Sequence, residues 1–150
     1  MLLADVNPLI YAHRPESPRA AEHRDWLAAA LCGPEPFGVS EQVLSSFVRI
    51  VTNHRVYREP TPPEIALDFC AAVLAGPASV AVRPGARHWS IFDGLCRGLG
   101  ARGNVVPDAY LAALAIENGA TWVTTDRGFA RFPGLRWVLP LGEDRRDPGL

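Results

Sequence analysis

Two kinds of hydrophobic pattern alternate along this chain: short continuous apolar runs, and stripes that repeat every three or four positions. Apolar runs bounded by turn residues predict buried strands, whereas the stripes predict amphipathic helices. The runs predict strands at residues 1–6, 37–39, 79–82, 121–125 and 136–139. The stripes predict helices at residues 18–32, 40–52, 62–74, 87–99 and 105–117, with helical turns at 7–12 and 127–132.

Polar residues stand where four of these helices are expected to begin. Ser and Asn are preferred N-caps because their side-chain oxygens accept hydrogen bonds from free backbone N–H groups. Proline is tolerated in the first helical turn, where its missing N–H costs nothing. The predicted N-caps are Ser17, Ser40, Thr61 and Asn104.

The alternation of strands and helices predicts an α/β fold in which helices cover both faces of a parallel sheet. No internal repeat is present, and the segment 60–63 is too short to separate two domains. We therefore expect one domain over residues 1–140, followed by a polar tail at residues 141–150. In the helix at 87–99, Trp89, Phe92 and Cys96 share one stripe and are predicted to face the core.

The composition of the chain limits the cellular compartments and the kinds of binding site that we expect. The net charge of −1 provides no overall field that attracts nucleic acid, so a polyanion site requires local patches or bound cations. The three cysteines match no metal spacing and are predicted to be small buried hydrophobes in a reducing cytosol. The chain shows no secretory leader and no apolar run long enough to span a membrane, so we expect a cytoplasmic protein.

Four acidic residues stand at the ends of predicted strands or the beginnings of predicted helices: Asp5, Glu41, Asp108 and Asp126. In an open parallel sheet, ligands bind beyond the carboxyl ends of the strands, so the four carboxylates are expected to share one edge. Each acid alone also fits a structural role as a turn residue, a cap or a partner of the helix dipole.

Carboxylates brought together repel one another and must bind protons or cations. Mg²⁺ or Mn²⁺ is the hard cation that a few carboxylates and several waters hold, with room for a phosphate. Two such ions form a clamp for phosphodiester hydrolysis, in which one activates water and the other stabilises the leaving oxygen. The four acids therefore predict a metal-dependent nuclease.

The order Asp, Glu, Asp, Asp resembles that of the PIN-domain ribonucleases, and in particular the VapC-type toxins of bacterial toxin–antitoxin pairs. The resemblance extends from residue 1 to about residue 140. It is carried by four segments: residues 3–12 (LADVNPLIYA), 41–53 (EQVLSSFVRIVTN), 103–116 (GNVVPDAYLAALAI) and 124–135 (TTDRGFARFPGL).

The resemblance implies a three-layer α/β/α fold around a parallel sheet of four to five short strands. It also implies that the acidic quartet binds Mg²⁺ or Mn²⁺ and cleaves RNA, often tRNA or rRNA. A cognate VapB-type antitoxin and a homodimer are the implied partners. The positions that support the acidic pocket in this family correspond to Asn7, Asn104 and Thr125. Relatives often carry a further Asp where Gly128 stands, so that carboxylate is missing here.

Three arginines near the end of the third long helix, Arg49, Arg55 and Arg58, either bind RNA phosphates or complement the C-terminus of that helix. An apolar groove for an antitoxin peptide is expected between residues 43–51 and 65–74. Two other functions remain open. One is a small phosphatase with Asp5 as nucleophile, although Asn7 stands where a second acid is expected. The other is a catalytically silent module that binds RNA or a partner.

Overall fold

A single sheet of five short parallel strands runs through the middle of the protein, in a computed structural model that describes residues 1–142. The strands lie in the order β3-β2-β1-β4-β5, so β1 is central. Every neighbouring pair is parallel, and Leu3 of β1 lies opposite Gly38 of β2 and Trp122 of β4. The strands are β1 (Leu2–Ala4), β2 (Phe37–Val39), β3 (Ser79–Ala81), β4 (Thr121–Val123) and β5 (Arg136–Val138).

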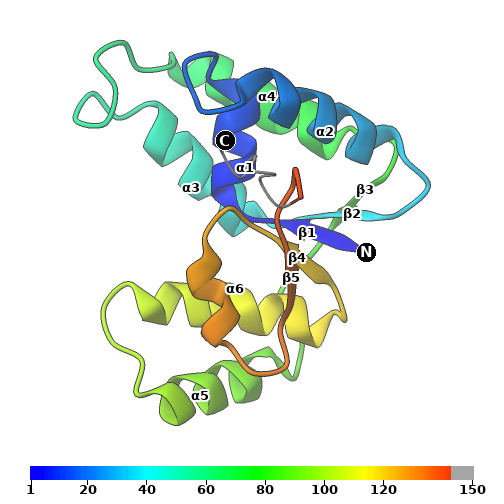
Figure 1. The fold of residues 1–150 in the computed structure, drawn as a ribbon, viewed down its shortest axis with the longest axis vertical. Helices are drawn as coiled ribbons and strands as arrows, with labels where there is room; N and C mark the ends of the chain where they lie inside the picture. Colours follow the sequence, from blue (N-terminus) through cyan, green and yellow to red (C-terminus); the bar gives the residue numbers. More distant parts are fainter. Residues whose placement is uncertain (143–150) are drawn as a thin grey trace, which may run out of the picture.

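Helices cover both faces of this sheet, as Figure 1 shows. The first four helices lie on one face, where α1 packs against α2 and α3, and α3 packs against α4. The last two pack against each other on the opposite face. The predicted three-layer α/β/α architecture is therefore confirmed. The helices are α1 (Val6–His13), α2 (Ala20–Cys32), α3 (Glu41–Val51), α4 (Pro63–Leu74), α5 (His88–Leu99) and α6 (Val105–Glu117), with a 3₁₀ helix, η1 (Arg127–Arg131).

The strand order creates a switch point between β1 and β4. From β1 the chain moves outward through β2 to β3, and it then returns across the sheet through α5 and α6 to β4. The crevice outside the carboxyl ends of the strands at such a point is the usual ligand site of an open α/β sheet. Asp5 follows β1 and Asp126 follows β4, so both reach this crevice.

Helix α6 packs closely on the sheet because its inner face is built from alanine. Ala109, Ala112, Ala113 and Ala115 are fully buried, and they pack with β4 in the same core. Alanine has the highest helix propensity and the smallest side chain of the helix formers, so it favours both the helix and the close approach. This packing fixes the start of α6, where Asp108 lies in the first turn.

Of the four predicted N-caps, Ser40 and Asn104 occupy the cap position without making a side-chain cap hydrogen bond, and the other two do not occupy it. Helix α2 begins at Ala20 rather than after Ser17, because Arg19 adopts a left-handed conformation (φ 51°) that interrupts the helix before that point. Thr61 is buried but does not cap α4. Its hydroxyl instead lies 2.9 Å from an Arg14 guanidinium nitrogen and 3.2 Å from Nε2 of His13, which ties the loop before α4 to the end of α1.

The predicted inward face of α5 is wrong for Trp89, whereas Phe92 and Cys96 are half-buried and pack against the core as expected. His88 and Leu95 are buried, and His88 Nε2 donates to the Tyr110 carbonyl at 2.9 Å, so the face against α6 centres on these residues. Trp89 lies beside that face and is 68% exposed.

The remaining predictions on burial and on the tail have mixed outcomes. Cys70 is buried and Cys96 half-buried, but Cys32, the last residue of α2, is exposed, so the prediction is wrong for Cys32. The predicted polar tail falls mainly on residues 143–150, which lie outside the described part of the chain. In residues 1–142, no helix has both the length and the apolar character needed to cross a membrane.

Glu117, the last residue of α6, anchors the segment before α5. Its carboxylate accepts hydrogen bonds from the backbone N–H groups of Gly85 at 2.8 Å and Arg87 at 3.0 Å. These bonds hold the pKa of Glu117 below its ordinary value. A Cβ at position 85 would lie 2.6 Å from the Glu117 carboxylate, so glycine permits this close approach.

Candidate metal centre

Asp5 is fixed between the end of β1 and the beginning of α1. Its backbone N–H donates to the Val123 carbonyl at 2.9 Å, which extends the pairing of β1 with β4. Its Oδ1 accepts a hydrogen bond of 2.7 Å from the Val6 N–H and so caps α1. The side chain is 6% exposed, so the carboxylate has one well-defined orientation in the crevice.

Thr124 connects Asp5 to the loop that carries Asp126. Its hydroxyl donates to Asp5 Oδ2 at 2.6 Å and accepts from the backbone N–H of Asp126 at 3.0 Å. Thr124 is fully buried, so these two bonds are shielded from competing water. One hydroxyl therefore sets the relative position of two predicted acids.

Asp126 caps η1 in the same way that Asp5 caps α1. Its Oδ1 accepts from the Gly128 N–H at 2.7 Å. A Cβ at position 128 would lie 2.8 Å from that oxygen and 2.5 Å from the Arg131 guanidinium. Glycine at this position therefore suits the tight turn, which accounts in part for the absence of a further acid there.

Asp108 completes a group of three acids that influence one another. Burial raises the pKa of Asp5 most, hydrogen bonds from Thr124 and Val6 oppose this rise, and the charges of Asp108 and Asp126 add to it. Burial also raises the pKa of Asp108, Asp126 raises it further, and Arg131 lowers it. The structure thus brings Asp5, Asp108 and Asp126 into one electrostatic group.

Glu41 lies at the same edge of the sheet but is paired differently. It is the first residue of α3, directly beyond the carboxyl end of β2. Its carboxylate accepts a 2.6 Å hydrogen bond from the Arg83 guanidinium, and this bond holds the pKa of Glu41 below its usual range. Both side chains are exposed, so water and ions compete for the pair.

The predicted supporting residues have different surroundings. Asn7, in the first turn of α1, and Thr125, directly before Asp126, are both half-buried. Asn104 precedes α6, but its backbone is already helical and its side chain makes no cap hydrogen bond. Thr124 was missed by sequence reasoning, which favoured its neighbour Thr125. The only available signal was the hydroxyl placed two residues before Asp126.

The arginines predicted to bind RNA are all exposed, but they lie away from the start of α3. Arg49 is eight residues beyond Glu41 on α3, which corresponds to ~12 Å along the helix. Arg55 and Arg58 follow in the loop before α4. The structure therefore does not gather them around the acids, and their role stays a prediction.

A divalent cation suits the three acids in its chemistry. Among residues 1–142, no group of three or more His, Cys, Asp or Glu side chains is close enough together to hold a metal ion as a cage. Mg²⁺, however, keeps several waters and uses only one or two protein carboxylates with substrate phosphate oxygens. The repulsion that raises the pKa of Asp5 and Asp108 is the kind that a bound cation removes.

Comparisons with known proteins match the whole region that carries the acids. Residues 2–135 fit the family model described as the PIN domain. Ribonuclease VapC43 of Mycobacterium tuberculosis is 49% identical over 141 residues, which cover 94% of this chain and 96% of that protein. The residues matched by the family model therefore include all four predicted acids.

Solved structures share the fold at lower sequence identity. VapBC2 from Rickettsia felis, bound to a DNA fragment from its promoter, has a TM-score of 0.64 and 20% identity, covering 91% of this chain and 96% of that one. VapC20 of Mycobacterium tuberculosis, described as a sarcin–ricin loop cleaving toxin, also has a TM-score of 0.64, with 16% identity and 91% and 99% coverage. At these identities the likeness establishes the fold alone.

Proposed function

Because this chain belongs to the PIN-domain family, we propose that it is an endoribonuclease that depends on Mg²⁺ or Mn²⁺ and acts as the toxin of a type II toxin–antitoxin pair. The observation that carries the proposal is the group formed by Asp5, Asp108 and Asp126 at the switch point of the sheet. Glu41 joins this set as the fourth acid. The nuclease domain spans residues 1–140.

The residues of the chain prepare the site by fixing some oxygens and leaving others available. Each carboxylate oxygen has two lone pairs, so Asp5 keeps one on each oxygen after its bonds to Val6 and Thr124. Oδ2 of Asp126 and both oxygens of Asp108 make no hydrogen bond to any residue in the range 1–142. These oxygens are the available ligands.

Asp5, Asp108 and Asp126 would hold the divalent cation, which would supply a polarised water and neutralise negative charge on the phosphodiester. The carboxylates orient the attack, and the hydrogen bonds of Thr124 and Gly128 prevent Asp5 and Asp126 from turning away. Hydrolysis of this kind leaves a 5′-phosphate and a 3′-hydroxyl. The sarcin–ricin loop activity of VapC20 supports structured RNA, such as rRNA or tRNA, as the substrate class.

An apolar groove between α3 and α4 supports the antitoxin as a partner. Leu44, Val48, Leu67 and Cys70 line it, and Leu67 is 56% exposed. Such a groove accepts the apolar face of an amphipathic helix. The Rickettsia felis complex contains both VapB and VapC, which supports a VapB-type antitoxin here. We further propose a homodimer that acts in the cytoplasm.

The proposed function is tested by incubating the purified chain with cellular RNA and mapping the new ends. We expect cleavage in Mg²⁺ or Mn²⁺ that leaves 5′-phosphates and stops with EDTA. Hydrolysis of an aryl phosphate without RNA cleavage would instead identify a phosphatase. RNA binding without any cleavage, at all metal concentrations, would identify a silent binding module.

A further inference from the structure

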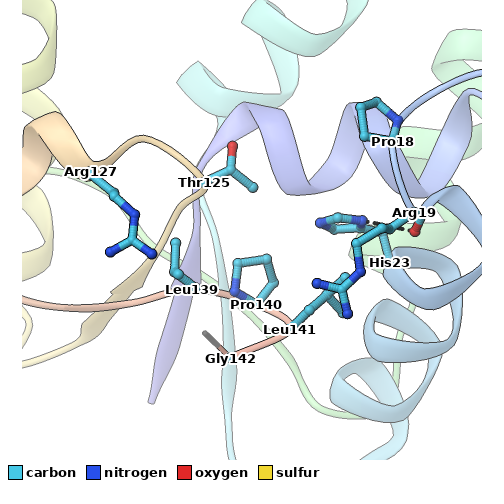
Figure 2. A pocket seen from close by; sticks show the side chains of 9 residues that line it. All are labelled: Pro18, Arg19, His23, Thr125, Arg127, Leu139, Pro140, Leu141 and Gly142. Atoms are coloured by element: carbon cyan, nitrogen blue, oxygen red, sulfur yellow. Dashed lines mark hydrogen bonds between the residues drawn. The ribbon is translucent and has the colours of Figure 1, made fainter. Parts of the chain in front are cut away.

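A cavity of about 190 Å³ opens beside the acidic group, between the beginning of α2 and the carboxyl ends of β4 and β5. Thr125 and Arg127, the residues on either side of Asp126, form one wall. Leu139 and Pro140, directly after β5, form an apolar wall, and Arg19 and His23 of the α2 segment close the opposite side (Figure 2). The cavity and the proposed metal centre therefore share the loop of Asp126.

His23 presents an unused hydrogen-bonding atom to this cavity. Its Nδ1 lies 3.0 Å from the Arg19 carbonyl oxygen, which can only accept, so Nδ1 carries the hydrogen. In the neutral ring, Nε2 is then an acceptor. Figure 2 shows the ring pointing from α2 into the space between Thr125 and Pro140, with Nε2 at its far end.

The burial of His23 makes this unused atom informative. The side chain is only 5% exposed, and Nε2 has no hydrogen-bond partner within residues 1–142. A buried polar atom without a partner is costly, and a molecule bound in the cavity would supply the missing partner. Any molecule that fills the cavity is therefore expected to present an N–H or O–H donor to His23.

The charge at the cavity favours an anion. Arg19 and Arg127 line it, and none of its described lining residues is acidic. Arg19 is held by Glu22 at 2.6 Å, whereas Arg127 is exposed and forms no hydrogen bond or ion pair within the described part of the chain. Arg127 thus offers a guanidinium to a phosphate at the entrance.

We propose that this cavity is a subsite for one nucleotide of the RNA strand next to the cleaved phosphodiester. The base enters between His23 and Pro140 and donates an N–H group to His23 Nε2, while its phosphate lies against Arg127. All three features are needed together: an apolar wall for the base, a buried acceptor for its edge, and a cation for its phosphate. The inference rests on the proposed ribonuclease activity and adds the residues that select the RNA base next to the cleavage site.

The test uses a randomised pool of short single-stranded RNA and the variants His23→Phe and Arg127→Ala. Phenylalanine keeps a planar aromatic ring but has neither Nδ1 nor Nε2, and the Arg19 carbonyl keeps its bond from the backbone N–H of residue 23. Sequencing of the cleaved ends should show that His23→Phe relaxes the base preference at one position by about 2- to 12-fold, the range for a single hydrogen bond. Cleavage of the pool itself should continue.

A second measurement is independent of cleavage. RNA affinity measured against salt concentration should show a slope that is smaller by ~0.7 for Arg127→Ala, as expected for one lost phosphate contact on a single strand. Arg97→Ala on α5 removes the same charge from an exposed residue that does not line the cavity, and it should leave the slope unchanged. Thermal melts check that each variant is folded.

The outcomes separate this inference from the proposed function. Absence of cleavage by the unaltered protein contradicts the nuclease activity, and the salt slope then still tests Arg127 as a phosphate contact. Cleavage with identical base preferences in the unaltered protein and His23→Phe, together with an unchanged slope in Arg127→Ala, overturns the subsite and leaves the nuclease intact.

Discussion

The hydroxyl of Thr124 donates a hydrogen bond of 2.6 Å to Oδ2 of Asp5, although 119 residues separate them in the sequence. The contact forms because Asp5 continues β1, Thr124 continues β4, and these strands are parallel neighbours. Since the same hydroxyl accepts from the Asp126 N–H, it couples two acids that come from different strands. The geometry of the proposed centre therefore depends on a neutral residue.

Replacing Thr124 with valine should impair cleavage more than stability. Valine has nearly the same shape but cannot donate to Asp5, so the carboxylate loses one of the two bonds that orient it. Loss of a partner that orients a metal ligand typically costs 10–100-fold in activity or metal affinity, and we expect about that decrease in kcat/KM for RNA cleavage.

Serine at the same position is the matched control, because it keeps the hydroxyl and removes only a methyl group. Thr124→Ser should retain most of the activity. If Thr124→Val, with an intact fold, cleaves RNA as fast as the unaltered protein, Thr124 does not position Asp5 for catalysis.

The pairing of Glu41 with Arg83 predicts competition between a guanidinium and a metal ion. Glu41 accepts from Arg83 at 2.6 Å, and a cation in the crevice must share or displace that contact. Arg83→Ala should therefore lower the Mg²⁺ concentration that gives half-maximal cleavage by a few-fold, whereas Glu41→Gln should raise it. Identical metal titration curves for both variants and the unaltered protein would remove Glu41 from the ligand set.

Glu117 predicts a pH-dependent contribution to stability. The pKa of Glu117 is lowered in the folded protein, mainly by the hydrogen bond from the Gly85 N–H. The ionised carboxylate therefore stabilises the fold at pH values above 4.5, the ordinary pKa of a glutamate. This contribution is lost as the pH falls through the lowered pKa. Glu117→Gln should therefore have a lower free energy of unfolding at pH 7, and the difference should be smaller at pH 3 than at pH 7. An equal difference at both pH values would contradict the linkage.

If the antitoxin binds in the groove between α3 and α4, a charged side chain introduced there should weaken its binding. Phe47 is fully buried, so charging it would unfold the protein, whereas Leu67 is exposed at the groove. Leu67→Glu should keep the thermal midpoint and weaken binding of the VapB-type partner at least about tenfold. Leu99→Glu on α5, also at an exposed leucine, is the control and should bind normally. Normal binding by Leu67→Glu would place the antitoxin elsewhere.

The sequence predicted the layers of the fold well because they depend on local periodicity. Each predicted strand and long helix exists, and most bounds differ from the predicted ones by one or two residues. The exceptions involve contacts that are distant in the sequence. Thr61 has a side chain suited to capping, but its hydroxyl is hydrogen-bonded to Arg14 and His13 instead. Both partners are more than 40 residues away in the sequence, so local sequence does not predict these contacts.

The candidate site was predictable only in part for the same reason. Asp5 and Asp126 follow parallel strands that end at one edge, and Asp108 joins them from the first turn of α6, as expected. The orientation of side chains within that edge depends on register and on partners such as Thr124 and Arg83. Neither partner carries a local pattern that distinguishes it from an ordinary strand or loop residue.

The most direct test of the proposed metal-dependent ribonuclease site compares RNA cleavage by the unaltered protein and by Asp108→Asn across a Mg²⁺ titration. Asn keeps the shape of Asp108 and removes a charge that Asp126 repels, so the variant should fold. We expect cleavage by the unaltered protein that EDTA abolishes and Mg²⁺ restores, and a rate lower by more than about 100-fold in Asp108→Asn. Equal rates for the two proteins, or cleavage that continues in EDTA, would contradict a metal-dependent ribonuclease built on these carboxylates.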